Sequence, residues 1–442
     1  MCDMAESHEI ALTVDLSLRI GEMLLSNGAG AADVTATMQS VAYHLGMRNP
    51  IVDVTFTSLS MSYQPEPGDV PLVMMRQVKQ RDIDYEDLTR IDHLVRDLLA
   101  DRIDLSEARA TVAQISSSGH ARHRWAVTAG IGVMSAGVGL MLGGNTLVVV
   151  IAFVAAMLID RTQLILYRQR LPTFYLQVAG GAVATLLALA AAAAKLDVDP
   201  SVVVTANIIM LLSGIGFMGG LQDALSGFYV TSNARMTEAL LSTAGIIAGV
   251  SGGLALGDVV GVDIGRLEPG RGGLTTVAMM SVGAAVAAAA FAFSAYSPKR
   301  ILIPIGIIAA IAIAITYGIE GAGFGRTWSV AVAALFIGLV SYSVSGRVKV
   351  PPLVIVVSAI VPLLPGLSIY RGLSLMSEGG ATSSGLVAII TAASVAIALA
   401  SGVILGEYIA QPLKREARKL EGRLSGPRLV GPFRARSSRR KR

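Results

Sequence analysis

The polar side chains that could do chemistry in this 442-residue chain stand within or beside long apolar runs. Asn207 lies in the middle of one run, where a buried amide needs a hydrogen-bond partner. Carboxylates at the ends of such runs are candidates for binding and releasing a proton, with a charge that simply reaches water as the alternative. Four residues fit this description and are our proton-coupling candidates: Asp160, Asp223, Asp258 and Glu407.

Backbone groups are a second source of chemistry. The segment IVPLLPGLSIY places Pro362 and Pro365 inside an apolar run, where each proline removes an N–H donor and leaves a carbonyl of the preceding turn free. Free backbone groups are tolerated in a bilayer only where they face protein or a watery cavity. We therefore predict substrate contact here, with a simple proline kink as the alternative. The predicted substrate-binding residues are Asn207, Ser213, Gly214, Gly216, Pro362, Pro365, Gly366 and Arg371.

An internal repeat relates these segments to one another. At an offset of 152 residues, Val198–Gly227 matches Val350–Gly379, with prolines and glycines in the same order. The proline-containing run then corresponds to IIMLLSGIGFMGG, in which a Ser-Gly-Ile-Gly sequence loosens the helix instead. At an offset of 149, Asp258 matches Glu407. Five helices separate the copies, so we predict inverted repeats, which in transporters place the substrate site where broken helices meet near the midplane.

The elements that must position these groups are long apolar helices. The chain is 53% hydrophobic and 15% charged, with a mean hydropathy of +0.62. A bilayer core about 30 Å thick needs about 20 apolar residues per helix. We therefore predict an α-helical polytopic membrane protein whose ten spans form two five-helix repeats, at 122–262 and 272–411. The expected spans are 125–143, 145–160, 173–194, 200–219, 237–257, 274–295, 300–318, 327–345, 352–370 and 385–410.

Charge is distributed unevenly along the chain and predicts its orientation. Residues 1–121 carry nine Lys/Arg against eighteen Asp/Glu, whereas residues 412–442 carry twelve against two. Basic connections stay on the cytoplasmic side, and an even number of spans places the basic tail on the same side as the N-terminus. We predict a plasma-membrane protein with both termini in the cytoplasm. The tail is expected to be disordered and to lie near anionic lipid rather than nucleic acid.

The residues before the first apolar run predict a cytosolic α/β domain at 1–121. Helices are expected over 11–46, broken at Asn27–Gly30, and over 84–116, with strands at Val52–Met61 and Leu72–Val78. The glycines of Asn27–Gly30 follow no strand and lack the Lys-Ser/Thr of a phosphate loop. A single cysteine forms no internal disulfide, and no Cys/His spacing suits a metal. We expect no cofactor, no metal and no enzymatic activity.

Four segments and their order resemble the bacterial threonine/serine exporter family from about residue 10 to 410. They are LRIGEMLLSNGAGAADVTATMQSVAYHLG, VDVTFTSLSM and DLTRIDHLVRDLLADRIDLSEARATVAQI in the first 121 residues and PLLPGLSIYRGL in the second repeat. The resemblance implies export of L-threonine and L-serine across the plasma membrane, driven by the proton motive force as in an antiporter. The positions that match the family lie in Gly21–Gly30 and Pro362–Gly372.

Alternatives remain open at this point. Some relatives of that family, split into two polypeptides, look like exporters of dicarboxylates such as succinate. A zwitterion needs N–H donors for its carboxylate and carbonyls or an acid for its ammonium group, whereas a dianion favours Arg371 or Arg235. A membrane-anchored sensor or enzyme acting through the first domain and a channel are the other classes. The expected partners are threonine or serine, protons and membrane lipid; the oligomeric state, a homo-oligomer included, stays open.

Overall fold

The computed structural model describes the chain except for residues 1, 79–82, 121, 212–213, 261–273, 366–367, 369–374, 376–381 and 421–442. The described residues form two compact units. The N-terminal unit consists of residues 1–119 together with the distant segment 223–232. The membrane unit consists of residues 120–222 and 233–420.

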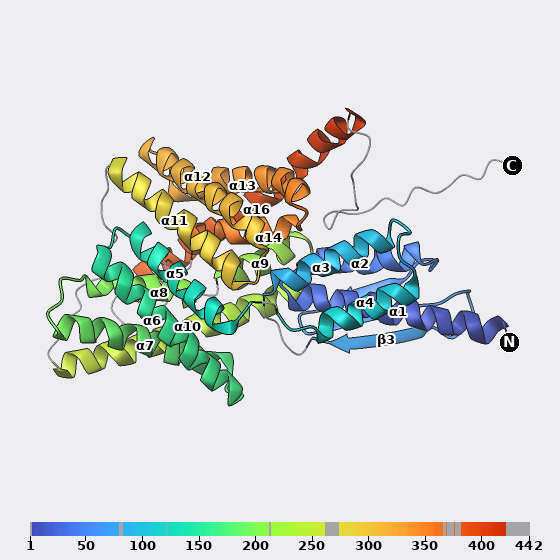
Figure 1. Ribbon diagram of the computed structural model, residues 1–442, viewed down its shortest axis with the longest axis horizontal. Helices are drawn as coiled ribbons and strands as arrows, with labels where there is room; N and C mark the ends of the chain where they lie inside the picture. Colours follow the sequence, from blue (N-terminus) through green and yellow to red (C-terminus); the bar gives the residue numbers. More distant parts are fainter. Residues whose placement is uncertain are drawn as a thin grey trace. The chain divides into compact units, whose positions relative to one another are not determined.

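The described part of the N-terminal unit combines helices with an antiparallel sheet in the order β1-β2-β3 (Figure 1). Its core is filled by apolar side chains of α1, α2, β2 and α3, among them Leu16, Met38, Met61 and Ile91, all fully buried. The elements are α1 Cys2–Ser26, α2 Ala31–His44, β1 Ile51–Val54, β2 Ser58–Tyr63, β3 Leu72–Gln77, α3 Tyr85–Leu98 and α4 Leu105–Ser117.

The strand that we expected at Val52–Met61 is a hairpin of β1 and β2. Val54 pairs with Leu59, and the chain turns between them, where the Thr55 and Ser58 hydroxyl groups lie 2.7 Å apart. The turn was missed because Thr, Phe and Thr at positions 55–57 are residues that favour strands and include no Gly, Pro or Asn. The resulting sheet is wholly antiparallel, without the parallel crossovers of a βαβ fold.

The membrane unit is built from helices alone in the part of it that the structure describes. Short 3-10 turns lie at the ends of two of them. The helices are α5 Arg124–Met141, α6 Thr146–Arg168, α7 Thr173–Ala193, α8 Pro200–Leu211, α9 Gly214–Leu225, α10 Tyr229–Val260, α11 Leu274–Ser294, η1 Lys299–Ile301, α12 Leu302–Gly321, α13 Arg326–Val348, α14 Pro352–Ile360, η2 Val361–Leu363 and α16 Thr382–Leu420.

Eight helices among the described residues are long and apolar enough to cross a bilayer, and α8 with α9 would make a ninth as one bent span. This makes the chain a multi-pass membrane protein. The predicted ninth span, 352–370, is described only in part, and Pro352–Leu363 is shorter than a span. The second span was also predicted too short, because α6 continues past Asp160 to Arg168. Its Asp160 carboxylate is neutralised by Arg124 at 2.6 Å and therefore does not have to end the helix.

The outer faces of these helices are apolar and uncovered by protein. Ile303, Ile307 and Ile311 follow one another at four-residue steps along one face of α12 and are 75, 55 and 43% exposed. Residues four apart lie on the same side of a helix. Such a face, with no protein neighbour in the described chain, suits contact with lipid tails.

The membrane unit contains two groups of helices with the same packing order, coloured cyan to yellow-green and yellow to red in Figure 1. In the first group α5 packs on α6, α6 packs on α7, and α8 contacts all three. In the second group α11 packs on α12, α12 packs on α13, and α14 contacts all three. The helices α8 and α14 both begin at prolines that the sequence repeat pairs, Pro200 and Pro352.

Close glycine contacts repeat with the same correspondence. A Cβ on Gly249 of α10 would lie 2.0 Å from the carbonyl oxygen of Val178 in α7, and a Cβ on Gly406 of α16 would lie 2.5 Å from that of Leu335 in α13. Both residues of the second pair follow those of the first by 157 positions. The same offset relates further glycines at these helix pairs, Gly181 with Gly338 and Gly245 with Gly402.

The offset of 157 differs from the offset of 149 at which the sequence pairs Asp258 with Glu407. At 157, Glu407 aligns with Val250, and Asp258 lies about two helical turns further along α10. Small and apolar residues recur about every four positions along these helices, so several registers look alike.

The two groups meet where α5 crosses α11. A Cβ on Gly137 of α5 would lie 2.9 Å from the carbonyl oxygen of Gly283, and a Cβ on Gly283 would lie 2.6 Å from that of Gly137. The nearest amide nitrogens follow the same pattern. The Ala287 nitrogen would lie 2.7 Å from the Cβ on Gly137, and the Met141 nitrogen would lie 2.5 Å from the Cβ on Gly283. The contact is therefore reciprocal, and the two helices run antiparallel.

Candidate functional site

Asn207 is fully buried in α8 of the membrane unit, and its amide bonds in two directions. Its Oδ1 accepts a hydrogen bond from the Ser135 hydroxyl of α5 at 3.1 Å, and its Nδ2 donates to the Val203 carbonyl of its own helix at 2.9 Å. The amide therefore has the partner that a mid-membrane position requires. Ser135 was missed from sequence because it stands in the small-residue stripe GIGVMSAGVG, which indicates only close packing.

Both predicted breaks lie where helices end. In the first group α8 ends at Leu211, and the Gly216–Leu225 part of α9 differs from it in direction by 43°. Gly214 and Gly216 fall in the first turn of α9, while Ser213 lies outside the described residues. In the second group α14 ends at Ile360 and passes into the short 3-10 turn η2.

Pro362 lies in that turn, and Pro365 is buried just after it. Because Pro362 has no N–H and Leu364 is already extended, the α-helical hydrogen-bond ladder does not continue through this segment. Gly366 and Arg371 lie outside the described residues.

The ends of the two broken helices come together. Val361 of η2 packs in one apolar cluster with Met134 of α5 and Ala290 of α11, and Met210 from the last turn of α8 packs against it. Leu364 joins the same cluster. Met210 is three residues beyond Asn207, and Met134 precedes Ser135. The structure therefore brings the Asn207–Ser135 pair and the region of Pro362 into one place, from four helices of both groups.

This place offers both kinds of backbone group. The last turn of a helix presents carbonyl oxygens, as α8 and α14 do here, whereas the first turn of a helix presents N–H groups, as α9 does. Carbonyls suit an ammonium group and N–H groups suit a carboxylate. These are the two kinds of group that a small molecule carrying both charges would need.

Asp160 of α6 is buried and forms an ion pair with Arg124 at the start of α5. The Arg124 guanidinium donates to its Oδ1 at 2.6 Å, and the Thr128 hydroxyl donates to its Oδ2 at 2.7 Å. The neighbouring Arg161 lies 3.5 Å above the Trp125 ring. These contacts hold α5 to α6 and engage both carboxylate oxygens of Asp160.

Glu407 is buried in α16, near α13, and is 7% exposed. Its Oε2 has no hydrogen-bond partner in the described part of the chain. The helices come close here because Gly338 of α13 has no side chain; a Cβ there would lie 3.2 Å from the Glu407 nitrogen. Asp258 lies in the last turn of α10, and the structure does not describe its side chain.

Asp223 is buried in the N-terminal unit, at the first turn of α2. Its Oδ1 accepts a hydrogen bond from the Ala31 nitrogen at 2.9 Å. The three of the four proposed carboxylates whose side chains the structure describes therefore have different surroundings: Asp160 is in an ion pair with Arg124, Asp223 lies against the first turn of α2, and Glu407 is buried in α16 near α13.

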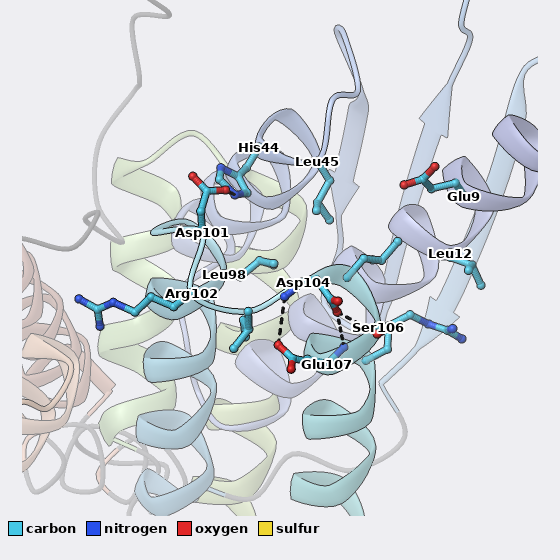
Figure 2. Close-up of a pocket in the computed structure, with 13 residues that line it drawn as sticks. Glu9, Leu12, His44, Leu45, Leu98, Asp101, Arg102, Asp104, Ser106 and Glu107 are labelled. Carbon is cyan, nitrogen blue, oxygen red and sulfur yellow. Dashed lines mark hydrogen bonds and ion pairs between the residues drawn. The ribbon is translucent and has the colours of Figure 1, made fainter.

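The N-terminal unit also carries a pocket of about 790 Å³ beside α1, at the ends of α2 and α3 and the start of α4 (Figure 2). Several of its polar lining residues bond one another. His44 Nε2 lies 3.1 Å from Asp101 Oδ1, and Asp104 and Glu107 form the reciprocal N-terminal cap of α4. We interpret the pocket as the space between helix ends. No cluster of three potential metal ligands occurs among the described residues.

Comparison with known proteins assigns the family. Residues 15–257 match the family model described as "Putative threonine/serine exporter", and residues 280–409 match the model described as "Threonine/Serine exporter, ThrE". No solved structure matches the chain.

Two curated relatives align along most of the chain. A protein of Mycobacterium tuberculosis (strain ATCC 25618 / H37Rv) named "Probable threonine/serine exporter" is 34% identical, over 94% of this chain and 80% of its own length. The "Threonine/serine exporter" of Corynebacterium glutamicum is 30% identical, over 94% of this chain and 86% of its own length. These names denote transporters and not enzymes, in agreement with the prediction from sequence. The chain belongs to the threonine/serine exporter family.

Proposed function

We propose that this protein exports threonine and serine from the cytosol across the plasma membrane in exchange for protons. The observation that carries the proposal is the meeting of the broken ends of α8 and α14 beside the buried Asn207–Ser135 pair. The two named relatives supply the substrate class. Asn207, Gly214, Gly216, Pro362 and Pro365, with the undescribed Ser213, Gly366 and Arg371, are the proposed substrate contacts.

The proposed architecture is a pair of inverted five-helix repeats with ten spans. Three observations support it. The packing order of α5–α8 recurs in α11–α14, and the glycine contacts of α7 with α10 recur at an offset of 157 in α13 with α16. The reciprocal, antiparallel contact of Gly137 with Gly283 is what a two-fold axis between the repeats would produce.

A threonine molecule at the proposed site has a partner for each charged group. Its carboxylate would take N–H groups at the start of α9, and its ammonium group would take carbonyls at the ends of α8 and α14. The Asn207 amide can accept from the substrate hydroxyl or donate to it after a small rearrangement of its bond to Ser135. Serine has the same three groups, which explains a shared site.

Glu407 is the proposed proton carrier. A buried carboxylate oxygen without a partner is the kind of group that transporters use for proton binding, whereas the ion-paired Asp160 is held in one state. Close packing of α16 on α13 through Gly338 places Glu407 where a relative movement of these helices would change its surroundings. The N-terminal unit and the basic tail are proposed to lie in the cytoplasm, following the charge of the connections.

The test is efflux of labelled threonine from cells preloaded with a threonine-containing dipeptide, with and without this protein. We expect faster efflux that collapses with a protonophore. Asn207→Ala and Pro362→Ala should insert normally and slow export. Thr316→Ala is the matched control, because Thr316 is buried in α12 but its hydroxyl bonds only the Ala312 carbonyl of its own helix.

Normal export by both site variants would refute the proposed site. Labelled succinate is measured beside threonine. The buried guanidinium of Arg235, 2.9 Å from a Cβ placed on Gly219, is the feature that would favour a dianion. Succinate efflux without threonine efflux would therefore overturn the substrate and direct attention to Arg235.

A further inference from the structure

The helices of the N-terminal unit differ in how their first turns are capped. The first N–H groups of any helix lack partners within it, and an acidic or hydroxyl side chain just before the helix usually accepts from them. Asp84 caps α3 by accepting from the nitrogens of Glu86 and Asp87, and Asp104 caps α4 by accepting from that of Glu107. At the corresponding position α2 has Gly30, which has no side chain to offer.

The missing cap of α2 comes from a residue 192 positions away. Asp223 Oδ1 accepts from the Ala31 nitrogen at 2.9 Å, and the carboxylate is only 1% exposed. The carboxylate lies directly against Gly30, since a Cβ there would be in ordinary van der Waals contact with the same oxygen, at 3.4 Å. A carboxylate at a helix N-terminus is also favoured by the positive end of the helix dipole. The contact therefore has the geometry and charge of a helix cap, supplied by another part of the chain.

The residues after Asp223 are held in the same unit. The α9 helix ends in a turn in which the Phe228 nitrogen donates to the Asp223 carbonyl at 2.8 Å and the Gly227 nitrogen donates to the Ala224 carbonyl at 3.0 Å. Gly227 has φ of +91°, as this helix ending requires. Thr231, 1% exposed, donates to the Val54 carbonyl at 3.4 Å. The segment 223–232 is thus bonded to α2 and to the end of β1.

One helix therefore belongs to both units. Up to Gln222, α9 is part of the membrane unit, and from Asp223 it is part of the N-terminal unit. The first residue of α9, Gly214, lies in the proposed substrate site, nine residues or about 14 Å along a helix from Asp223. A helix of this length is stiff, so fixing its end limits where its beginning can lie.

We propose that Asp223 is a positioning residue, whose contact with the N-terminus of α2 fixes the end of α9 and thereby sets the position of the broken helix at the substrate site. The contact gives the N-terminal unit a direct means of controlling transport. It also explains how α2 can begin at Gly30, which has no capping side chain of its own. The transport part of this inference rests on the proposed export function.

The test separates a control of α9 from simple stabilisation of α2. Asp223→Ala removes the cap. Adding Gly30→Asp to it gives α2 a cap of its own, because Gly30 has an extended backbone (φ −69°, ψ 151°) that suits a capping aspartate and the space of the lost carboxylate is free. Asp104→Ala is the matched control, a cap removed from α4 in the same unit with no link to a membrane helix. Each full-length variant is measured for amide hydrogen exchange and for threonine export.

We expect Asp223→Ala to speed exchange in the first turn of α2 and in 223–232 by about two- to thirty-fold, the range that corresponds to loss of a helix cap. Threonine export should fall, while Asp104→Ala should export normally. With Gly30→Asp added, α2 should recover its protection, whereas 223–232 and export should not recover. Recovery of export would overturn the proposal, because Asp223 would then serve α2 alone. Unchanged exchange of 223–232 in Asp223→Ala would overturn it as well.

The exchange measurement needs no transported substrate. If the wild-type protein exports no threonine in these cells, the proposed function fails, while the exchange of 223–232 still decides whether Asp223 fixes the end of α9.

Discussion

Replacing Gly283 by alanine should loosen the junction between the two groups of membrane helices. Gly283 lies where α11 crosses α5, and a Cβ there would stand 2.5 Å from the Met141 nitrogen and 2.6 Å from the Gly137 carbonyl oxygen. Both neighbours are backbone atoms, so no flexible side chain can move aside. Alanine itself favours a helix over glycine, and any loss of stability must therefore come from the crossing.

The size of the effect follows from these distances. The two helices must separate by about 0.9 Å before the shorter contact reaches 3.4 Å, where ordinary van der Waals contact begins. Inserting a methyl group into a packed core typically costs about 1–3 kcal/mol, and we expect the upper half of that range because the neighbours are backbone. The reciprocal Gly137→Ala, with contacts of 2.7 and 2.9 Å, should cost somewhat less.

The assay is the temperature at which purified protein in detergent loses its monodisperse form, measured together with export. Gly283→Ala should lower this temperature by roughly 5 °C and slow export. Gly318→Ala is the control, since a Cβ on Gly318 of α12 would meet nothing within 4 Å and alanine should be neutral or slightly stabilising there. Equal melting temperatures for Gly283→Ala and Gly318→Ala would refute the close crossing and, with it, this support for a two-fold arrangement.

Three further predictions follow. Glu407→Gln, which cannot bind and release a proton, should insert normally and export at a rate insensitive to external pH; an unchanged pH dependence would exclude Glu407 as the carrier. A double-mutant cycle with Asn207→Ala and Ser135→Ala, measured as free energies of unfolding, should give a coupling energy of about 0.6 kcal/mol, typical of hydrogen bonds between membrane helices. Additive losses of stability would contradict the bond. Burial raises the pKa of Asp92 in α3, opposed by Arg96 at 2.6 Å, so this group destabilises the fold increasingly as pH rises above its ordinary pKa of 3.8. Asp92→Asn should therefore increase exchange protection of α3 more at pH 7 than near pH 4, and an equal effect at both would be inconsistent with the raised pKa.

Much of the fold could be predicted from local sequence patterns. Apolar runs of about 20 residues predicted α5, α7, α11, α12 and α13 because a span must satisfy the same length wherever it occurs. The breaks at Asn27–Gly30 and after Leu211 were predicted because glycine weakens a helix by itself. These properties depend on a few neighbouring residues, and sequence contains them in full.

Errors arose where a distant residue changed the local outcome. Asp160 was expected to end a helix, but Arg124, 36 positions earlier, pairs with it and the helix continues. Likewise, the face of α16 that meets α13 is defined by the close contacts of Gly338, Gly402 and Gly406, which exist only once the helices are packed. Ser135 is recognisable as a partner of Asn207 only because α5 and α8 are neighbours in space.

The start of α2 shows how an absence in sequence can itself be informative. Both α3 and α4 begin after an aspartate, and the local cap could be recognised from the residues Asp84 and Asp104. At α2 the chain instead has Gly30, which leaves the Ala31 nitrogen buried without a local acceptor. A buried N–H must still be satisfied, so an uncapped helix start inside a core requires an acceptor from elsewhere in the fold. Asp223 meets that requirement from the segment 223–232, so the absence of a local cap at Gly30 indicates that a residue far along the chain completes the N-terminal unit.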